Sequence, residues 1–168
     1  MNKPVLSFAI LIISLFSFSC NNGGTPAQDT GKESRPVFDL VAARKEIDSA
    51  NRNFMDLIRK GDSVGLANAY TVDAQMMAPN APAAAGRKNI QTMISYLLNM
   101  GVGSLGFTTT GLWGDENMLI EEGIDSAMSK DGKVIDKGKY IVLWKKEEGK
   151  WKLFRDCFNS DWPAPASK

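Results

Sequence analysis

The sequence predicts an α+β fold in which three N-terminal helices pack on one face of a curved, mainly antiparallel sheet. Two observations predict it. Apolar residues recur at steps of three and four in the first half of the chain, whereas four long segments typical of strands fill the second half. The breaks between these segments are short and carry hairpin residues: Gly114-Asp115, Lys130-Asp131-Gly132 and Glu147-Glu148-Gly149. Consecutive strands with short turns form an antiparallel meander, and helices that precede such a sheet cover one of its faces.

The first helix is predicted from a stripe of apolar residues between Leu40 and Ile58. Gly61 ends this helix, and Asp62 can cap the short helix that follows. Residues 101–106 spell G-x-G-x-x-G, but a predicted helix precedes them and a strand follows, which is the reverse of a dinucleotide site. The expected elements are, in chain order, helices at about 39–60 and 63–70, a short strand at 72–78, a third helix between Gly86 and Gly101, and strands at 105–113, 117–128, 137–146 and 151–162.

The first twenty residues predict export. Lys3 is the one charged residue before Cys20, and an apolar run at 5–16 follows it, which is typical of a secretory signal peptide. The run is shorter than the roughly 20 apolar residues of a membrane-spanning helix. A Cys at the cleavage point resembles a bacterial lipoprotein signal, although Ser17 stands where Leu is usual. A plain membrane anchor, or secretion with a free thiol at Cys20, are the alternatives. The expected organisation is a signal peptide at 1–19, a flexible tether at 20–35, a domain at 36–163 and a tail at 164–168.

On this interpretation the protein is a lipoprotein of the bacterial cell envelope, in the periplasm or at the outer membrane, and is held to a membrane through lipids on Cys20. The chain has a net charge of +1, and Lys3 lies in the leader, so the mature chain is close to neutral. A neutral chain gives no electrostatic reason to expect a nucleic-acid partner. Cys157 is then the remaining thiol, and we expect a buried small hydrophobe rather than a nucleophile.

The chain contains no histidine. Catalysis of the Ser-His-Asp or Cys-His type is therefore excluded, as are zinc, haem and non-haem iron sites that use histidine ligands. No calcium-loop spacing occurs either, so neither a metal nor a cofactor is expected. Any acid–base chemistry must use Asp, Glu, Tyr or Lys.

Short motifs stand at the joints between the predicted elements, in this order: Gly61-Asp62, Tyr70-Thr71-x-Asp73-Ala74, Gly86-Arg87-x-x-Ile90, Glu121-x-Gly123, Lys137-Gly138-Lys139-Tyr140-x-Val142-x-Trp144-Lys145-Lys146 and Gly149-Lys150-Trp151-Lys152-Leu153-x-Arg155-Asp156-x-x-Asn159-Ser160-Asp161. From about residue 40 to 163 the chain therefore resembles the SnoaL-like/DUF4440 branch of the NTF2-like superfamily. The resemblance implies a cone, formed by a bent sheet wrapped on helices around an apolar pocket, and often a homodimer through the outer face of the sheet. The superfamily includes ketosteroid isomerase, polyketide cyclases, dehydratases and non-catalytic binding modules, so the fold does not define the function.

The resemblance also bears on catalysis. Ketosteroid isomerase uses an Asp base with a Tyr and a protonated Asp as hydrogen-bond donors. At the corresponding places this sequence has Phe54 for the Tyr and Ala78 for the base, and the place of the second acid falls at about Lys139 or Tyr140, where no carboxylate stands. Phe cannot donate a hydrogen bond and Ala cannot accept a proton. A mechanism of that type is therefore not expected here.

Two carboxylates remain as candidates. Strict alternation places Asp156 on the same strand face as Phe154 and Phe158, where burial would raise its pKa and suit it to proton transfer. Alternatively, Asp156 forms an ion pair or caps a turn. Glu122 lies between two isoleucines on its strand, and either a pocket role or a salt bridge at the sheet edge fits that pattern.

Tyr140, Val142 and Trp144 alternate on one face of their strand and can line the cone, although core packing or a dimer interface explains them equally well. We expect a small apolar or amphipathic molecule to bind in the cone without catalysis. The alternatives are an isomerase-, cyclase- or hydratase-like enzyme that uses Asp156 or Glu122 with Tyr140 as donor, and a dimeric assembly module. The residues expected to contact the ligand are Phe54, Met77, Tyr140, Trp144, Asp156 and Asn159.

Overall fold

The structure is a computed structural model that describes residues 37–163. The predicted signal peptide, the predicted lipidation site Cys20, and the predicted tether and tail lie outside the described residues. Within the described part, no helix is long and apolar enough to cross a membrane. The elements are α1 (Leu40–Lys60), α2 (Ser63–Asn68), β1 (Tyr70–Met77), β2 (Ala84–Ala85), α3 (Gly86–Asn99), β3 (Val102–Gly114), β4 (Met118–Ser129), β5 (Val134–Glu147) and β6 (Lys150–Phe158).

Capping residues stand at the ends of the first two helices, and two of them, Gly61 and Asp62, are those that the sequence predicts. The Asp39 side chain accepts a hydrogen bond from the Ala42 backbone N–H at 2.9 Å at the start of α1. Gly61 ends that helix in the left-handed conformation, with φ of 68°. Asp62 then caps α2 by accepting from the Gly65 N–H at 2.8 Å. These local interactions fix the angle at which the two helices join.

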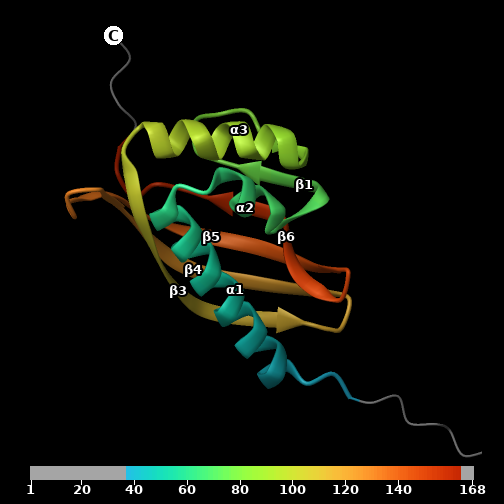
Figure 1. Cartoon of the computed structure of the whole chain (residues 1–168). Helices are drawn as coiled ribbons and strands as arrows, with labels where there is room; N and C mark the ends of the chain where they lie inside the picture. Colours follow the sequence, from blue (N-terminus) through green and yellow to red (C-terminus); the bar gives the residue numbers. More distant parts are fainter. Residues whose placement is uncertain (1–36, 164–168) are drawn as a thin grey trace, which may run out of the picture. The chain divides into compact units, whose positions relative to one another are not determined.

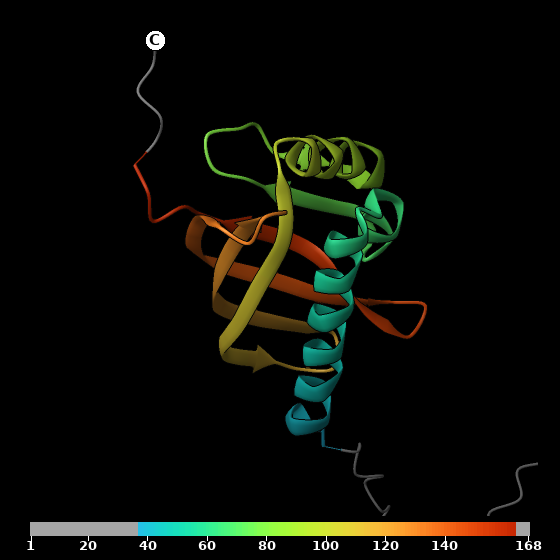
Figure 2. The same ribbon diagram turned by 60° about the vertical axis from the view of Figure 1, so that its left-hand side comes forward.

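The six strands form one sheet in the order β2-β1-β6-β5-β4-β3. Strands β3 to β6 form the predicted antiparallel meander, and the predicted α+β architecture is confirmed. Strand β1 pairs with β6 in the parallel sense, so the sheet is mixed. Helix α1 packs against β3 and α3 packs against β1, which places both helices on the same side of the curved sheet (Figures 1 and 2).

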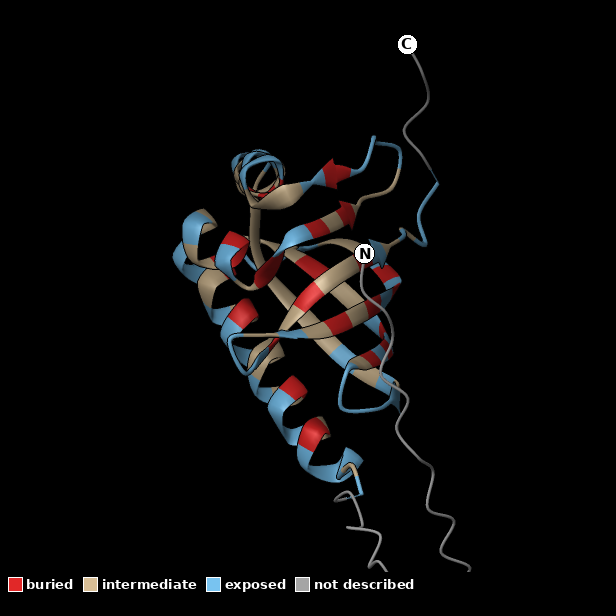
Figure 3. Cartoon of the chain, turned by 90° about the vertical axis from the view of Figure 1, so that its right-hand side faces the viewer, coloured by how far each residue is buried: buried red, intermediate tan, exposed pale blue. Residues whose placement is uncertain are grey.

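The core lies between the helices and the inner face of the sheet (Figure 3). Side chains on β4 and β5 alternate between this core and the outer face. The outer face carries several exposed apolar residues, among them Ile120, Ile124 and Ile141. Cys157 also lies on the exposed side of β6, so its predicted burial is wrong. The reason is a change in the alternation of β6, described below.

Candidate functional site

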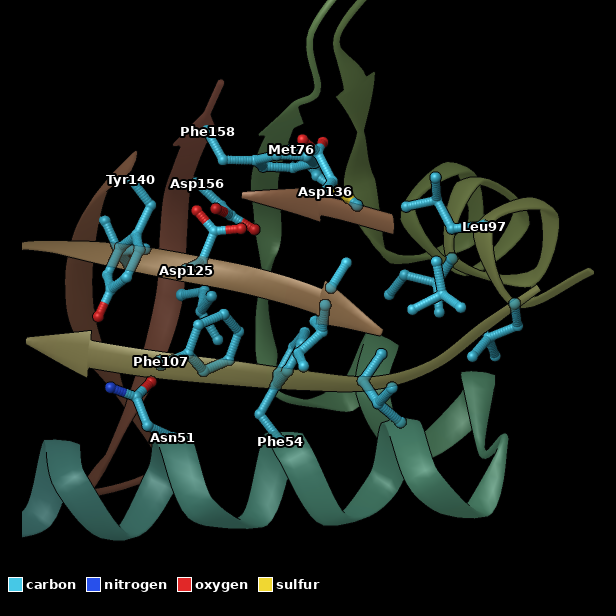
Figure 4. A pocket seen from close by; sticks show the side chains of 18 of the residues that line it. Asn51, Phe54, Met76, Leu97, Phe107, Asp125, Asp136, Tyr140, Asp156 and Phe158 are labelled. Atoms are coloured by element: carbon cyan, nitrogen blue, oxygen red, sulfur yellow. The ribbon is translucent and has the colours of Figure 1, made fainter. Parts of the chain in front are cut away.

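A cavity of about 580 Å³ lies between the sheet and helices α1 and α3. Most of its wall is apolar, and side chains from both helices and from strands β1 and β3 to β6 contribute to it (Figure 4). A volume of this size is in the range of pockets that hold small molecules. The apolar wall includes Phe54, Ile58, Met76, Ile94, Leu97, Leu105, Phe107, Val142, Leu153 and Phe158.

A β-bulge in β6 decides which side chains of that strand enter the cavity. Trp151 and Leu153 are buried, as regular alternation predicts. The register between β5 and β6 then skips Phe154, and the alternation changes phase. Asp156 and Phe158 consequently line the cavity, whereas Phe154 does not. The predicted shared face of these three residues is therefore wrong for Phe154.

Asp156 is the most deeply placed carboxyl group of the cavity wall, with 9% of its residue surface exposed. Tyr70 on β1 donates a hydrogen bond from its hydroxyl to Asp156 Oδ2 at 2.6 Å. Burial raises the pKa of Asp156 to about 6, and the negative charges of Asp125 and Glu121 act in the same direction, while the bond from Tyr70 opposes them. Burial and the nearby Asp156 also raise the pKa of Tyr70 well above its ordinary value. At neutral pH the pair is therefore a carboxylate with a neutral phenol donor.

Two further carboxyl groups line the same part of the cavity. The carboxyl groups of Asp125 and Asp156 lie next to each other in Figure 4, in keeping with the effect of one charge on the pKa of the other. Asp125 Oδ1 is buried and accepts no hydrogen bond. Burial raises the pKa of Asp125, and the charges of Asp136 and Asp161 raise it further. Asp136 accepts hydrogen bonds from the Ser160 hydroxyl at 2.6 Å and from the backbone N–H of the residue that follows it at 2.8 Å.

Glu121 on β4 is fully buried, and four neutral groups donate hydrogen bonds to it. Its Oε1 accepts from Asn51 Nδ2 at 2.8 Å, from the Thr109 hydroxyl at 2.6 Å and from the Tyr140 hydroxyl at 2.9 Å. Its Oε2 accepts from Trp144 Nε1 at 2.9 Å. Both oxygens of the carboxyl group are thus occupied, and the network ties α1 to strands β3, β4 and β5.

The structure brings three of the six predicted ligand contacts to the cavity: Phe54, Tyr140 and Asp156. Met77, Trp144 and Asn159 do not line it. Met76, not Met77, lines the cavity. Trp144 is buried and donates a hydrogen bond to Glu121, and Asn159 Oδ1 accepts a hydrogen bond from the backbone N–H of Lys139 at 3.1 Å.

Glu122 lies on the exposed outer face, so the alternative that gave it a pocket role is wrong. Its neighbours on the same strand face, Ile120 and Ile124, suggest an inward face by their apolar character. Both isoleucines are exposed, and the inward face of β4 instead carries Glu121, Gly123 and Asp125. Counting every second residue from Leu119, which is fully buried, instead of from Ile120 would have identified this inward face.

The comparisons with known proteins identify the fold. No protein-family model and no curated protein sequence matches the chain. Solved structures do match. A ketosteroid isomerase-like protein from Erwinia carotovora atroseptica has 19% identity and a TM-score of 0.59, over 71% of this chain and 96% of that one. An NTF2-like protein with a cystatin-like fold from Novosphingobium aromaticivorans has 13% identity and a TM-score of 0.62, over 76% and 87% of the two chains.

The chain has the NTF2-like fold. A third match, a protein from Catenulispora acidiphila solved in complex with S-DNPA, has 16% identity and a TM-score of 0.62, over 72% and 95% of the two chains. At these identities the similarity shows the fold alone, and function must be argued from the site.

The two residues that the sequence resemblance matches to ketosteroid isomerase, Phe54 and Ala78, supply no ionisable group to the cavity. Phe54 lines the cavity but carries no hydrogen-bonding group, and Ala78 follows the end of β1 and does not line the cavity. The ionisable groups come from other positions, chiefly Tyr70, Asp125 and Asp156. The wall is thus richer in acidic groups than the sequence analysis predicted.

Proposed function

We propose that the domain binds a small apolar or amphipathic molecule in its cone. The observation that carries this proposal is the cavity itself: about 580 Å³, with a mainly apolar wall and its ionisable groups gathered around Asp125 and Asp156. An apolar wall favours the burial of a hydrocarbon body, and a few convergent polar groups fix the orientation of a ligand.

Native mass spectrometry of the protein purified from its host tests this proposal. The expected result is a retained small molecule that dissociates on denaturation. Leu97 on α3 lines the cavity, so Leu97→Trp should occupy part of the space and abolish retention. Its neighbour Tyr96 is 58% exposed and does not line the cavity, which makes Tyr96→Trp a matched control that should retain the molecule. Equal retention by both variants would contradict the proposal.

Proton transfer by Asp156 is a second candidate function. The observation in its favour is a buried carboxyl group that faces the cavity, holds a pKa of about 6 and has the Tyr70 hydroxyl as a hydrogen-bond partner. A general base is most effective when its pKa is near the working pH. The test is incorporation of solvent deuterium into the retained molecule, measured by NMR, for the natural protein and for Asp156→Asn. Exchange that requires Asp156 would support an isomerase- or cyclase-like reaction, and its absence would leave binding alone.

We also propose that lipids on Cys20 hold the domain at a membrane of the cell envelope. The support is the leader sequence, in which an apolar run ends at Cys20. Metabolic labelling with a radioactive fatty acid tests it, because Cys20→Ser should lose the label and accumulate as unprocessed precursor. A chain that carries no label would refute lipidation.

We also propose that a second copy of the chain packs on the outer face of the sheet and forms a homodimer. That face exposes large apolar side chains on neighbouring strands, with Ile124 on β4 and Ile141 on β5 each about half exposed, at 52% and 50%. Light scattering at increasing protein concentration tests the dimer, and Ile141→Lys should shift it toward the monomer. A natural protein that is monomeric throughout would refute this proposal.

A further inference from the structure

We propose that the molecule bound in the cone carries a basic amino group, which is held between the carboxylates of Asp125 and Asp156. This inference rests on the proposed binding function and adds the chemical class of the ligand. It follows from the negative charge of the cavity wall, from the carboxylate oxygens that accept no hydrogen bond, and from the kinds of ligand group that could donate hydrogen bonds to them.

The wall of the cavity has only one sign of charge. Asp125, Asp136 and Asp156 line it, and none of its described lining residues is Lys or Arg. Lys139, whose charge acts to lower the pKa of Asp125, lies on the exposed face of β5 and is paired with Asp161. Because carboxylates next to apolar surface lose hydration without gaining a counter-ion, the cavity favours a cation from outside the chain.

The carboxyl groups of Asp125 and Asp156 each have an oxygen without a protein donor. Asp156 uses Oδ2 to accept from Tyr70, while its Oδ1 makes no hydrogen bond, although the residue is nine-tenths buried and lines the cavity. Asp125 Oδ1 is buried and unpartnered as well. Asp156 Oδ1, unlike the enclosed Asp125 Oδ1, is open to the cavity. Buried acceptors are normally satisfied, so this pair of carboxyl groups indicates a donor that the ligand supplies.

An alkylammonium group fits these acceptors because it has three N–H donors and a positive charge. A hydroxyl has one donor and no charge, so it would satisfy one of the two acidic groups. A carboxylate or phosphate would place a further negative charge beside Asp125 and Asp156. A divalent metal prefers six or more oxygen ligands, and no group of three metal-ligating side chains occurs among the described residues.

Three probes of equal chain length separate these chemistries: decylamine, decanol and decanoate, titrated into the purified protein at pH 7 and followed by calorimetry. Decylamine should bind about tenfold more tightly than decanol, because a charge-assisted hydrogen bond contributes more than a neutral one, and decanoate should bind most weakly. The variants Asp125→Asn and Asp156→Asn should each weaken decylamine by about tenfold and change decanol by less than about twofold. Glu122→Gln makes the same chemical change on the outer face of β4 and should leave all three affinities unaltered.

The outcomes distinguish the two proposals. If decanol or decanoate binds as tightly as decylamine, the cone binds ligands but the amine inference is overturned. If the preference for decylamine survives in both Asn variants, the amino group is not held by these carboxylates and the inference is again overturned. If none of the three probes binds and no molecule is retained from the host, both the inference and the binding function fail. Circular dichroism of each Asn variant verifies that the change acts on a folded protein.

Discussion

The stability of the protein should decrease as Asp156 ionises. The pKa of this carboxyl group is about 6 in the folded chain against an ordinary value of 3.8, so folding favours its protonated form. Its contribution to stability is fully present below pH 3.8 and is lost as the pH rises through 6. A difference of about 2 pKa units corresponds to about 3 kcal/mol, since each unit is worth 1.36 kcal/mol. Asp156→Asn removes this dependence and keeps an acceptor for Tyr70.

The measurement is the free energy of unfolding in urea between pH 4 and 8, followed by tryptophan fluorescence. Relative to Asp156→Asn, the natural protein should lose about 2 of these 3 kcal/mol between pH 4 and 7, so the variant should be the more stable of the two at neutral pH. Because the chain has no histidine, no imidazole group titrates between pH 4 and 8 and contributes to the pH dependence of stability. Asp125, whose pKa is also raised, is present in both proteins. Two curves that stay parallel within about 0.5 kcal/mol would refute the assignment of Asp156 as a buried, desolvated acid.

Three further predictions test the packing of the sheet. Glu121→Ala leaves four donors without an acceptor, of which those of Tyr140 and Trp144 are buried, and should lower the free energy of unfolding by about 3 kcal/mol. Glu122→Ala on the outer face should change it by less than about 0.5 kcal/mol, and similar losses in both variants would contradict the network. Gly123→Ala would place a Cβ 2.4 Å from the Tyr140 ring and should cost about 1–3 kcal/mol in the same urea assay, so an unchanged midpoint would show that Tyr140 does not lie over this glycine. Cys157 should react with a thiol reagent in the folded protein without denaturant, and Cys157→Ser should abolish that reaction; modification only after unfolding would show that the thiol is buried.

The elements of the fold could be predicted because their signals are local. Gly114, Gly132 and Gly149 lie in the three turns of the meander and have positive φ values of 132°, 83° and 75°, which glycine tolerates. The parallel pairing of β1 with β6 could not be predicted in the same way. It joins Tyr70 to Leu153 across more than half of the domain, and no turn or periodic pattern marks such a contact.

The site was predicted less well, for two physical reasons. On β6, alternation was extended through Phe154, but the bulge adds one residue there and changes the phase beyond it. On β4, the isoleucines at 120 and 124 predict the inner face by their apolar character. Apolar side chains are common on protein surfaces, and here the inner face carries Glu121 and Asp125 instead. The apolar isoleucines on the outer face therefore explain both why Glu122 was predicted as a candidate and why Glu121 and Asp125 were not.

The two tyrosine–carboxylate pairs of the cone differ in what they leave free, and this difference separates structure from function. Glu121 has both oxygens engaged by four donors, so its partner Tyr140 is committed and neither group is available to a ligand without breaking the network. Asp156 has one donor, Tyr70, and one oxygen that faces the cavity beside Asp125. A fully satisfied buried carboxylate holds elements together, whereas a partly satisfied one is costly unless something else completes it. The fully bonded pair, Glu121 with Tyr140, therefore explains how α1 is held on the sheet. The partly bonded pair, Asp156 with Tyr70, carries a desolvation cost that a bound molecule would offset.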